Sequence, residues 1–435
     1  MNPIAKELNA TIEAGNPHIL EMLSGIGREL FFPKGILSQS AEAKEKAHTI
    51  NATIGIAKEG KGIMHLSSVM GMIGGLAPEE SITYAPSFGI PGLRKQWQTE
   101  IFAKNPGLKG RSISLPVVTC GITHAISIFA DVWTNPGDTV LLPDMMWGNY
   151  NMILSVRKGV KIAQFKLFDE KGGFNLDAFA TRAKELANKD GKLIVLMNFP
   201  HNPTGYTARE KEGEDLAAIL TGIAESGSNV IVVCDDSYFG LFYEPDVMKE
   251  SLFAKLCNRH PRLLPIKLDG ATKEIYVWGL RVGFITYGCA ADSNLAGIFD
   301  ALEKKTAGCI RGNISNASHL SQTITLKSLQ SDSYQKEKKE KYEILKGKAA
   351  RVKAVLADPK YAAAWDVYPF NSGYFMCIRL KTVNAEKLRV HLLDKYGVGL
   401  ISIGDHDLRV AFSCIEEKDV QLLFDTVLKG VQELG

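Results

Sequence analysis

Short apolar runs, each followed by Gly, Pro, Asn or Asp and then by helical patterning, recur through much of the chain. Seven of these runs are candidate strands: 116–119, 139–142, 160–165, 193–198, 230–234, 275–278 and 283–287. Strands that alternate with helices in this way are typical of a mainly parallel sheet with helices on its faces. The pattern therefore predicts an α/β region from about residue 75 to 310.

The last quarter of the chain has a different pattern. From Ser331 the segment YQKEKKEKYEILKGKAARVKAVL mixes charges of both signs at helical spacing, which predicts a long exposed helix. Strand-like YFMCIRL and LRVAF follow it, so we expect a smaller α+β domain that also takes in part of the N-terminus. The predicted division is 1–65 for an N-terminal arm and part of the small domain, 66–325 for the large domain, and 326–435 for the C-terminal small domain.

The composition is that of an ordinary globular protein. Of the 435 residues 45% are hydrophobic and 23% are charged, which excludes disordered, collagen-like and coiled-coil classes. Lysine and arginine number 51 against 48 aspartate and glutamate, a net charge of +3, so the overall charge indicates neither nucleic acid nor a membrane as partner. The glutamates within the basic run after Ser331 argue against a nucleic-acid-binding arm.

The seven cysteines are scattered, without a C-x-x-C pair. They are Cys120, Cys234, Cys257, Cys289, Cys309, Cys377 and Cys414. An odd, dispersed set predicts reduced thiols rather than a disulfide framework or a zinc site. No stretch approaches the ~20 apolar residues of a membrane span, and the first residues are polar where a signal peptide needs an apolar run. We therefore expect a cytoplasmic protein without a metal and without membrane contact.

Candidate chemistry lies around the ends of the predicted strands, because open parallel sheets bind ligands beyond the carboxyl ends of their strands. FPHNPTG occupies 199–205 after one strand, DDSY occupies 235–238 after another, and DGATK occupies 269–273 before a third. A buried lysine with a lowered pKa is a nucleophile near neutral pH. From Lys273 alone, a plain surface lysine is the simpler interpretation.

The motifs together carry a family resemblance. HNPTG, D-x-x-Y and a T-K-x7-R-x-G segment from Thr272 to Gly283 occur in this order. They resemble the fold-type I, class I/II aminotransferases that depend on pyridoxal 5′-phosphate (PLP), and aspartate aminotransferases most closely. The resemblance extends from roughly Asn51 to Arg409. It implies a large domain with a mainly parallel sheet flanked by helices, a smaller α+β domain, and PLP as cofactor.

The resemblance also implies the catalytic roles. Lys273 matches the lysine that binds PLP covalently and then moves a proton between the substrate Cα and the cofactor. Asp235 matches the partner of the pyridine nitrogen, and Asp236 is the alternative one residue further on. Tyr238 and Asn202 match the groups that hydrogen-bond the O3′ of the cofactor, although an Asn-Pro turn is a second role for Asn202.

Six groups are implied around the phosphate of the cofactor. They are Gly121, Ile122, Thr123, Thr272, Arg281 and, from the neighbouring subunit, Tyr84. Arg281 lies eight residues after Lys273, as the phosphate-binding arginine does, and a helix N-terminus after Gly121 would offer backbone N–H groups. The sequence departs from the family twice: His124 stands where glycine is commoner, and Gly270 stands where many members carry serine.

The ring and substrate contacts complete the implied site. Trp147 matches the aromatic residue that stacks on the pyridine ring, although a tryptophan after a strand is often a core residue. Arg409 matches the arginine for the α-carboxylate, and Gly55 matches the glycine that closes over the ligand. Arg311, followed by Ser315 and Asn316, matches the arginine that crosses the dimer to a side-chain carboxylate. A structural ion pair at the subunit interface is the alternative for Arg311.

The implied activity is transfer of an amino group between an L-amino acid, with aspartate or another dicarboxylate favoured, and a 2-oxo acid by a ping-pong mechanism. The match of Tyr84 implies a homodimer with shared sites. A β-lyase, decarboxylase or synthase of the same fold stays open, because one PLP site can break different bonds. A non-catalytic PLP-binding regulator is disfavoured because no DNA-binding segment accompanies the motifs, and a nicotinamide enzyme because no strand is followed by G-x-G-x-x-G.

Overall fold

A seven-stranded mixed sheet is the largest element of the computed structural model, which describes residues 1–15, 20, 23, 25–30, 36–60, 62–291 and 293–435. The strand order is β4-β10-β9-β8-β7-β5-β6. The strands are β4 Val117–Thr119, β5 Thr139–Pro143, β6 Lys161–Phe165, β7 Lys192–Asn198, β8 Asn229–Asp235, β9 Leu263–Gly270 and β10 Gly283–Tyr287. Strands β6, β5, β7, β8 and β9 are parallel, and β10 is antiparallel to both of its neighbours.

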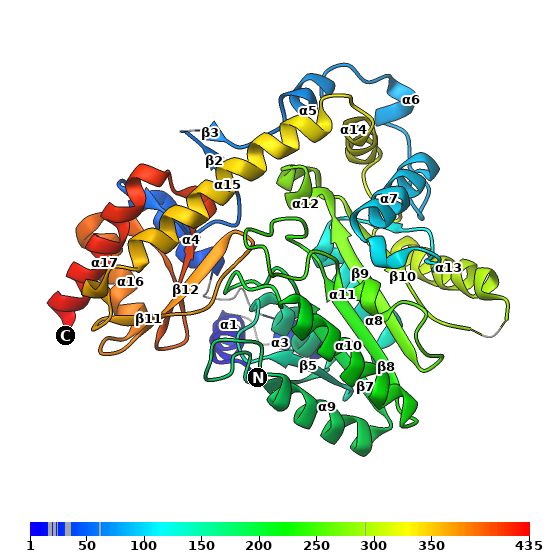
Figure 1. Ribbon diagram of the computed structural model, residues 1–435, viewed down its shortest axis with the longest axis horizontal. Coiled ribbons are helices and arrows are strands. Elements are labelled where there is room, and N and C mark those ends of the chain that lie inside the picture. The colour runs from blue at the N-terminus through cyan, green and yellow to red at the C-terminus, as the bar shows by residue number, and fades with distance from the viewer. Residues whose placement is uncertain (16–19, 21–22, 24, 31–35, 61, 292) are drawn as a thin grey trace.

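Helices cover both faces of this sheet (Figure 1). The main cover consists of α8 Ile122–Trp133 and α13 Leu295–Asn313 on one face, and α7 Pro91–Lys104, α9 Leu176–Asp190, α10 Glu210–Glu225 and α11 Leu252–Leu256 on the other. Along β7, Val195 packs into the core beneath α9 and α10, while Ile194 and Leu196 pack into the core beneath α8 and α13. A strand covered on both faces needs such a continuous apolar run, which is why the sequence pattern reveals it.

A four-stranded antiparallel sheet forms the second unit, in the order β11-β12-β15-β14. Its strands are β11 Trp365–Val367, β12 Phe375–Leu380, β14 Ile401–Ile403 and β15 Asp407–Ala411, and its helices are α15 Tyr334–Leu356, α16 Ala385–Tyr396 and α17 Val420–Leu434. From the N-terminal part, β1 Ile50–Asn51 pairs with β13 Val398–Gly399. The N-terminal segment therefore joins the C-terminal unit, as the sequence predicts, while the proposed domain limits at 65 and 325 stay a prediction.

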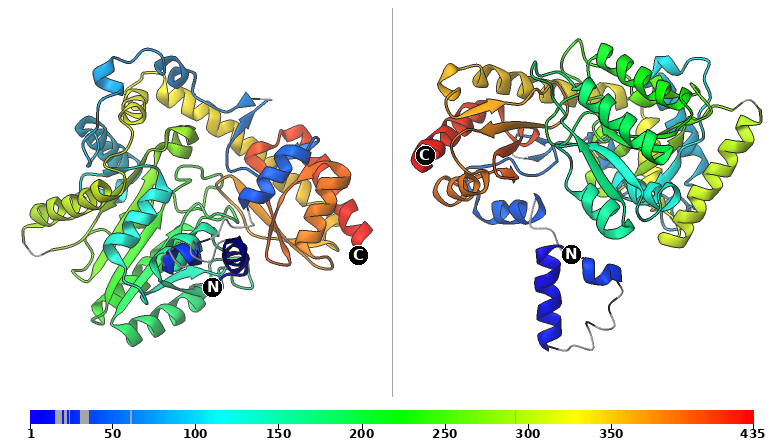
Figure 2. Two further views of the ribbon diagram at one scale, coloured as in Figure 1. Left: turned by 180° about the vertical axis from the view of Figure 1, so that it is seen from behind. Right: turned by 90° about the horizontal axis from the view of Figure 1, so that it is seen from below.

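The remaining elements connect these units, lie outside them or, like α4, pack on the small unit. They are α1 Pro3–Gly15, α3 Gly25–Glu29, α4 Ile36–Lys46, β2 Lys58–Glu59, β3 Gly62–Ile63, α5 Ser67–Met72, α6 Pro78–Ser81, α12 Ala271–Glu274 and α14 His319–Leu329. Short 3₁₀ helices lie at η1 Pro106–Leu108, η3 Trp278–Leu280, η4 Pro359–Tyr361, η5 Phe412–Cys414 and η6 Glu417–Asp419, and a π-helix lies at η2 Asn151–Val156. Figure 2 shows α1 and α3 projecting from the side of the molecule.

The long helix predicted after Ser331 is confirmed as α15, which extends from α14 to the small sheet (Figure 1). It is less exposed than predicted, because Leu345, Ala349 and Val352 on one of its faces are buried. Among the described residues, no helix is both long enough and apolar enough to cross a membrane.

One predicted strand is wrong. Residues 275–278 follow the short helix α12 and run into the turn η3, and the position in the sheet belongs to β9 instead. Pro265, Lys267 and Asp269 interrupt the apolar run of β9, so its sequence does not look like a buried strand. The charges of Lys267 and Asp269 are nevertheless accommodated, because Lys267 forms ion pairs with Asp236 and Asp269 inside the protein.

Candidate active site

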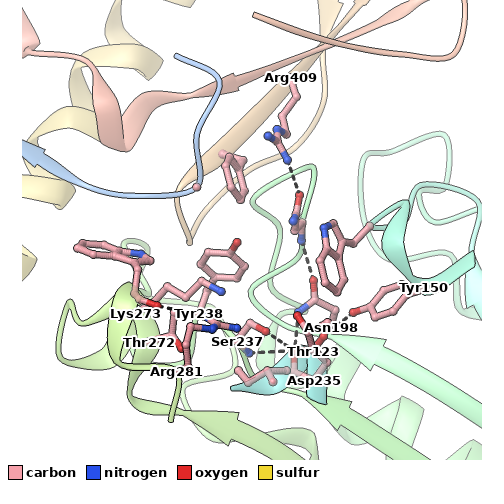
Figure 3. A pocket seen from close by; sticks show the side chains of 16 residues that line it. Thr123, Tyr150, Asn198, Asp235, Ser237, Tyr238, Thr272, Lys273, Arg281 and Arg409 are labelled. Carbon is pink, nitrogen blue, oxygen red and sulfur yellow. Dashed lines mark hydrogen bonds between the residues drawn. The ribbon is translucent and has the colours of Figure 1, made fainter. Parts of the chain in front are cut away.

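A cavity of about 370 Å³ lies at the carboxyl ends of β7, β8 and β9, next to the small sheet (Figure 3). Its lining consists of Gly55, Ile122, Thr123, Trp147, Tyr150, Asn198, Asn202, Asp235, Ser237, Tyr238, Thr272, Lys273, Trp278, Arg281, Phe375 and Arg409. Of the site residues predicted from sequence, only Gly121, Tyr84 and Arg311 are missing from this list. The fold therefore brings together groups from segments that are more than 350 residues apart, since Gly55 and Arg409 line one space.

Lys273 lies in the short helix α12, which begins directly where β9 ends. Its Nζ lies 4.6 Å from the centre of the Tyr238 ring. Burial lowers the pKa of Lys273, Asp235 opposes the change, and nearby Arg281 adds to it, so that the pKa is about 8. A far larger fraction of this amine than of an ordinary lysine is therefore uncharged near neutral pH, and the uncharged form is the one that attacks or accepts a proton.

Asp235 ends β8 and is held by three donors. Tyr150 donates its hydroxyl to Oδ2 over 2.5 Å, and Ser237 donates its backbone N–H and its hydroxyl to Oδ1 over 3.1 and 2.5 Å. Burial raises the pKa of Asp235, and these donors oppose the rise. The alternative, Asp236, is absent from the cavity lining; its carboxylate forms an ion pair with Lys267 and accepts from Ser251 at 2.6 Å. The geometry therefore favours Asp235 as the carboxylate that a ligand would meet.

A second cluster forms where α8 begins. Gly121 precedes α8 with a φ of +79°, in the left-handed region that favours glycine. A Cβ at Gly121 would lie 2.5 Å from Nη2 of Arg281, so the guanidinium rests against the peptide backbone at the helix N-terminus. Ile122, Thr123 and Thr272 line the cavity beside it. Unpaired backbone N–H groups and a guanidinium make this corner suited to an anion such as a phosphate.

The structure gives physical reasons for both departures from the family pattern. The Nδ1 of His124 accepts the backbone N–H of Cys120 over 3.0 Å, which ties the loop before α8 to the helix. Burial lowers the pKa of His124, which favours the neutral imidazole that such an acceptor needs. A Cβ at Gly270 would lie 2.7 Å from the carbonyl oxygen of Val282, so β10 leaves no room there for serine.

Arg409, on β15, lies at the opposite end of the cavity from Arg281 (Figure 3). It is 2% exposed and donates to Oδ1 of Asn202 over 3.1 Å and to the carbonyl of Thr53 over 2.9 Å. Its guanidinium carbon lies 4.3 Å from the centre of the Phe375 ring. Among the described residues no carboxylate lies within ion-pair distance of it, and its Nε has no hydrogen-bond partner. Because a buried guanidinium without a counter-charge is costly, this end of the cavity is suited to a carboxylate ligand.

A hydrogen-bonded chain runs from Arg409 to the end of β8. Beyond the contact with Arg409, the backbone N–H of Asn202 donates to Oδ1 of Asn198 over 2.8 Å. Asn198 in turn donates to the carbonyl of Asp235 over 2.8 Å. The HNPTG loop is thereby fixed to the end of β8. Gly55 closes the wall on the other side, where a Cβ would lie 3.3 Å from Phe375.

Besides Gly121, two predicted residues are absent from the cavity lining of this chain. Tyr84 is 90% exposed. Arg311 lies exposed in the last turn of α13 and donates to the hydroxyl of Ser315 over 2.8 Å. Neither can serve the cavity of its own chain in this arrangement, so their predicted roles depend on a second subunit.

Five lining residues were not predicted: Tyr150, Asn198, Ser237, Trp278 and Phe375. Asn198 and Ser237 lie at or just after strand ends, so the rule that found Asp235 could have found them. Tyr150 and Phe375 reach the cavity only through tertiary packing, and no local signal marks them.

The chemistry of this donor set fits PLP. The corner beside Arg281 is suited to the phosphate, Asp235 to a protonated ring nitrogen, and Lys273 to an aldehyde. The close approach of Arg281 to Gly121 and the unpartnered Nε of Arg409 leave both ends of the cavity suited to anions.

Comparisons with known proteins agree with this geometry. The model of the family described as "Aminotransferase class I and II" matches residues 76–427. An aspartate aminotransferase of Sulfurisphaera tokodaii is 27% identical over 202 residues, which are 46% of this chain and 47% of that one, so the chain spans about half the length of curated relatives such as this one.

Solved structures extend the likeness to nearly the whole fold. An aminotransferase from Anaerococcus prevotii superposes with a TM-score of 0.83 at 23% identity, over 94% of this chain and 98% of that one. A kynurenine aminotransferase from Pyrococcus horikoshii, in complex with the cofactor in its amine form (PMP), gives 0.78 at 17% identity, over 97% and 98%. Because the family model covers residues 76–427, the chain belongs to the class I and II aminotransferases, whose members use PLP and have fold type I.

Proposed function

We propose that this protein transfers an amino group between an L-amino acid and a 2-oxo acid in a ping-pong cycle with PLP. The observation that carries the proposal is the placement of Lys273: its amine, with a pKa lowered to about 8, lies in one cavity with Asp235 and between two arginines at opposite ends. When bound, PLP supplies an aldehyde for the amino group and a ring that withdraws the electron pair released at the substrate Cα.

Each residue then has a defined task. Arg281, with the backbone at the start of α8, binds the phosphate, and Asp235 holds a proton on the ring nitrogen. Arg409 binds the substrate α-carboxylate and so orients the Cα–H bond toward Lys273. The Nζ of Lys273 would accept that proton and would return it at the cofactor carbon that receives the amino group.

A half-reaction tests the activity. The PLP-loaded protein, mixed with an amino donor and no acceptor, should release one 2-oxo acid per site and convert all of the cofactor to its amine form. A β-lyase would release ammonia and a decarboxylase carbon dioxide, in many turnovers and without stoichiometric conversion. Absence of any conversion across a panel of amino acids would support a non-catalytic PLP-binding regulator instead.

The proposed donor is a dicarboxylate such as aspartate. The cationic residues that line the cavity are Lys273, Arg281 and Arg409, and each has a task already, so a second carboxylate needs another cation. Arg311 of the partner subunit is our candidate. An aromatic donor is the second possibility, because Trp147, Trp278 and Phe375 also line the cavity, and one structural neighbour is described as a kynurenine aminotransferase.

We infer that the active unit is a homodimer in the cytoplasm. The predicted place of Tyr84 at a subunit interface is supported by other exposed apolar side chains along 70–84. They are Met70, Ile73 and Ile82, of which Ile82 is 83% exposed. A second copy covering this surface would bring Tyr84 to the neighbouring phosphate site. Mixing inactive Lys273→Ala and Tyr84→Phe chains should restore activity in hybrid dimers, and full activity of a monomer would contradict the claim. The cytoplasmic location rests on the seven free thiols.

A further inference from the structure

Tyr150 contacts two of the groups that are expected to hold the cofactor ring. Its hydroxyl donates to Oδ2 of Asp235 over 2.5 Å. Its ring meets the Trp147 ring edge to face, with centroids 5.4 Å apart and an interplanar angle of 85°. One side chain thus contacts both the predicted partner of the ring nitrogen and the predicted stacking residue.

Tyr150 is itself firmly held. Its backbone N–H donates to the carbonyl of Trp147 over 3.0 Å, so the two residues share one turn. The side chain is 2% exposed and packs in the core beneath α8 with Ile153 and Leu154. Close-packed interiors resist small displacements, so a side chain held in this way also restricts the positions of the groups that it contacts.

The hydrogen bonds of Asp235 explain why its position matters. Ser237 occupies Oδ1 with two donors, and Tyr150 occupies one acceptor site of Oδ2. A carboxylate oxygen can accept a second hydrogen bond, so Oδ2 keeps one site for a donor in the cavity. Without the Tyr150 hydroxyl, Oδ2 could turn away from the cavity, and burial would favour the protonated, uncharged acid.

We propose that Tyr150 is a positioning residue that aims Asp235 and Trp147 at the ring of bound PLP and keeps Asp235 ionised. The proposal rests on the proposed function, since it concerns the same site. It assigns Tyr150 no proton transfer and no contact with the substrate. Its consequence is that the hydroxyl of Tyr150 sets the proton affinity of the cofactor ring nitrogen.

The chain offers a matched control. Tyr206 is also 2% exposed, and its hydroxyl donates to Oε2 of Glu212 over 2.6 Å, but it is absent from the cavity lining. Tyr150→Phe and Tyr206→Phe each remove a hydroxyl by which a buried tyrosine donates to a carboxylate, Asp235 being buried and Glu212 partly exposed, and both carboxylates keep other donors. A general effect of losing such a hydrogen bond should appear equally in both variants.

The test uses full-length protein loaded with PLP that carries ¹⁵N at the ring nitrogen. The ¹⁵N chemical shift as a function of pH gives the proton affinity of that nitrogen, and dilution gives the rate of PLP release. In Tyr150→Phe we expect the proton affinity to fall about tenfold and PLP release to accelerate about tenfold, because hydrogen bonds to charged groups are worth about this much. Tyr206→Phe should match the wild type in both measurements.

Three results would overturn the proposal. The first is a Tyr150→Phe protein whose ring-nitrogen titration and PLP release equal those of the wild type. The second is an equal change in both variants, which would make the effect structural. The third is failure of wild-type protein to bind PLP, which would remove the proposed function as well and is recognised before any variant is compared. Thermal unfolding of the apoproteins checks that both variants are folded.

Discussion

Asp235 and Asp236 are consecutive in the chain, yet Asp235 lines the cavity while the Asp236 carboxylate forms an ion pair with Lys267 in the protein interior. We therefore assign the chemical role to Asp235 and a structural role to Asp236. We expect Asp235→Asn to slow turnover by roughly 100-fold or more, because the ring nitrogen loses its anionic partner. Asp236→Asn should lower stability but keep the turnover of the folded enzyme within a few-fold. If Asp236→Asn is the variant that abolishes turnover and Asp235→Asn is mild, the assignment is off by one residue.

The buried ion cluster of Lys267 gives a stability prediction. Lys267 is paired with Asp236 and Asp269, and all three side chains are nearly inaccessible to solvent. Lys267→Met leaves two carboxylates without their cation and should lower the free energy of unfolding by about 3 to 5 kcal/mol, measured by urea denaturation. Lys304→Met, which breaks an exposed pair with Asp300, is the control and should change it by less than about 1 kcal/mol. Equal effects of the two substitutions would show that the buried cluster is not a special source of stability.

The lowered pKa of Lys273 predicts how fast the apoprotein binds PLP at different pH. Only the uncharged amine attacks the aldehyde, so the rate should rise with pH, with a midpoint of about 8, and then level off. Asp235 favours the charged form of Lys273, so Asp235→Asn should move the midpoint to lower pH. Stopped-flow absorbance measures the rate. A midpoint near the ordinary lysine value of about 10.4 would contradict the burial of this amine.

Arg311 decides the proposed dicarboxylate specificity. If Arg311 of the partner subunit binds the distal carboxylate in a closed site, Arg311→Ala should cost about 3 kcal/mol or more for aspartate, which is over 100-fold in kcat/KM. Phenylalanine, with no distal charge, should lose much less. An unchanged ratio of kcat/KM for aspartate over phenylalanine would rule out the specificity role, and weaker dimerisation with equal losses would indicate a structural ion pair.

Sequence patterns predicted the strands whose residues are apolar on both faces, and the motif residues that follow them. They did not predict the strand β9, because Lys267 and Asp269 look like surface residues until the ion pairs that Lys267 forms with Asp269 and with Asp236, just after β8, are known. Tyr150 was not predicted for a related reason. Its hydrogen bond to Asp235 joins residues 85 positions apart in the sequence and depends on how the loop after β5 packs. Local patterns cannot show such contacts. The lack of space for a side chain at Gly270 likewise follows only from the tertiary structure, because the backbone at the start of β10 fills that space.

The most direct test of the account is to find which lysine holds PLP and whether an amino donor releases the cofactor from it. The PLP-loaded protein is reduced with borohydride before and after incubation with an amino donor, and its peptides are mapped by mass spectrometry. We predict that the mass of reduced PLP is attached to Lys273 before incubation and is lost from it afterwards, because the cofactor then leaves lysine as the amine form. Lys267, which is 1% exposed and forms ion pairs in the interior, serves as the internal control and should stay unlabelled. Label on any other lysine, or label that stays on Lys273 with every amino acid offered, would contradict the account.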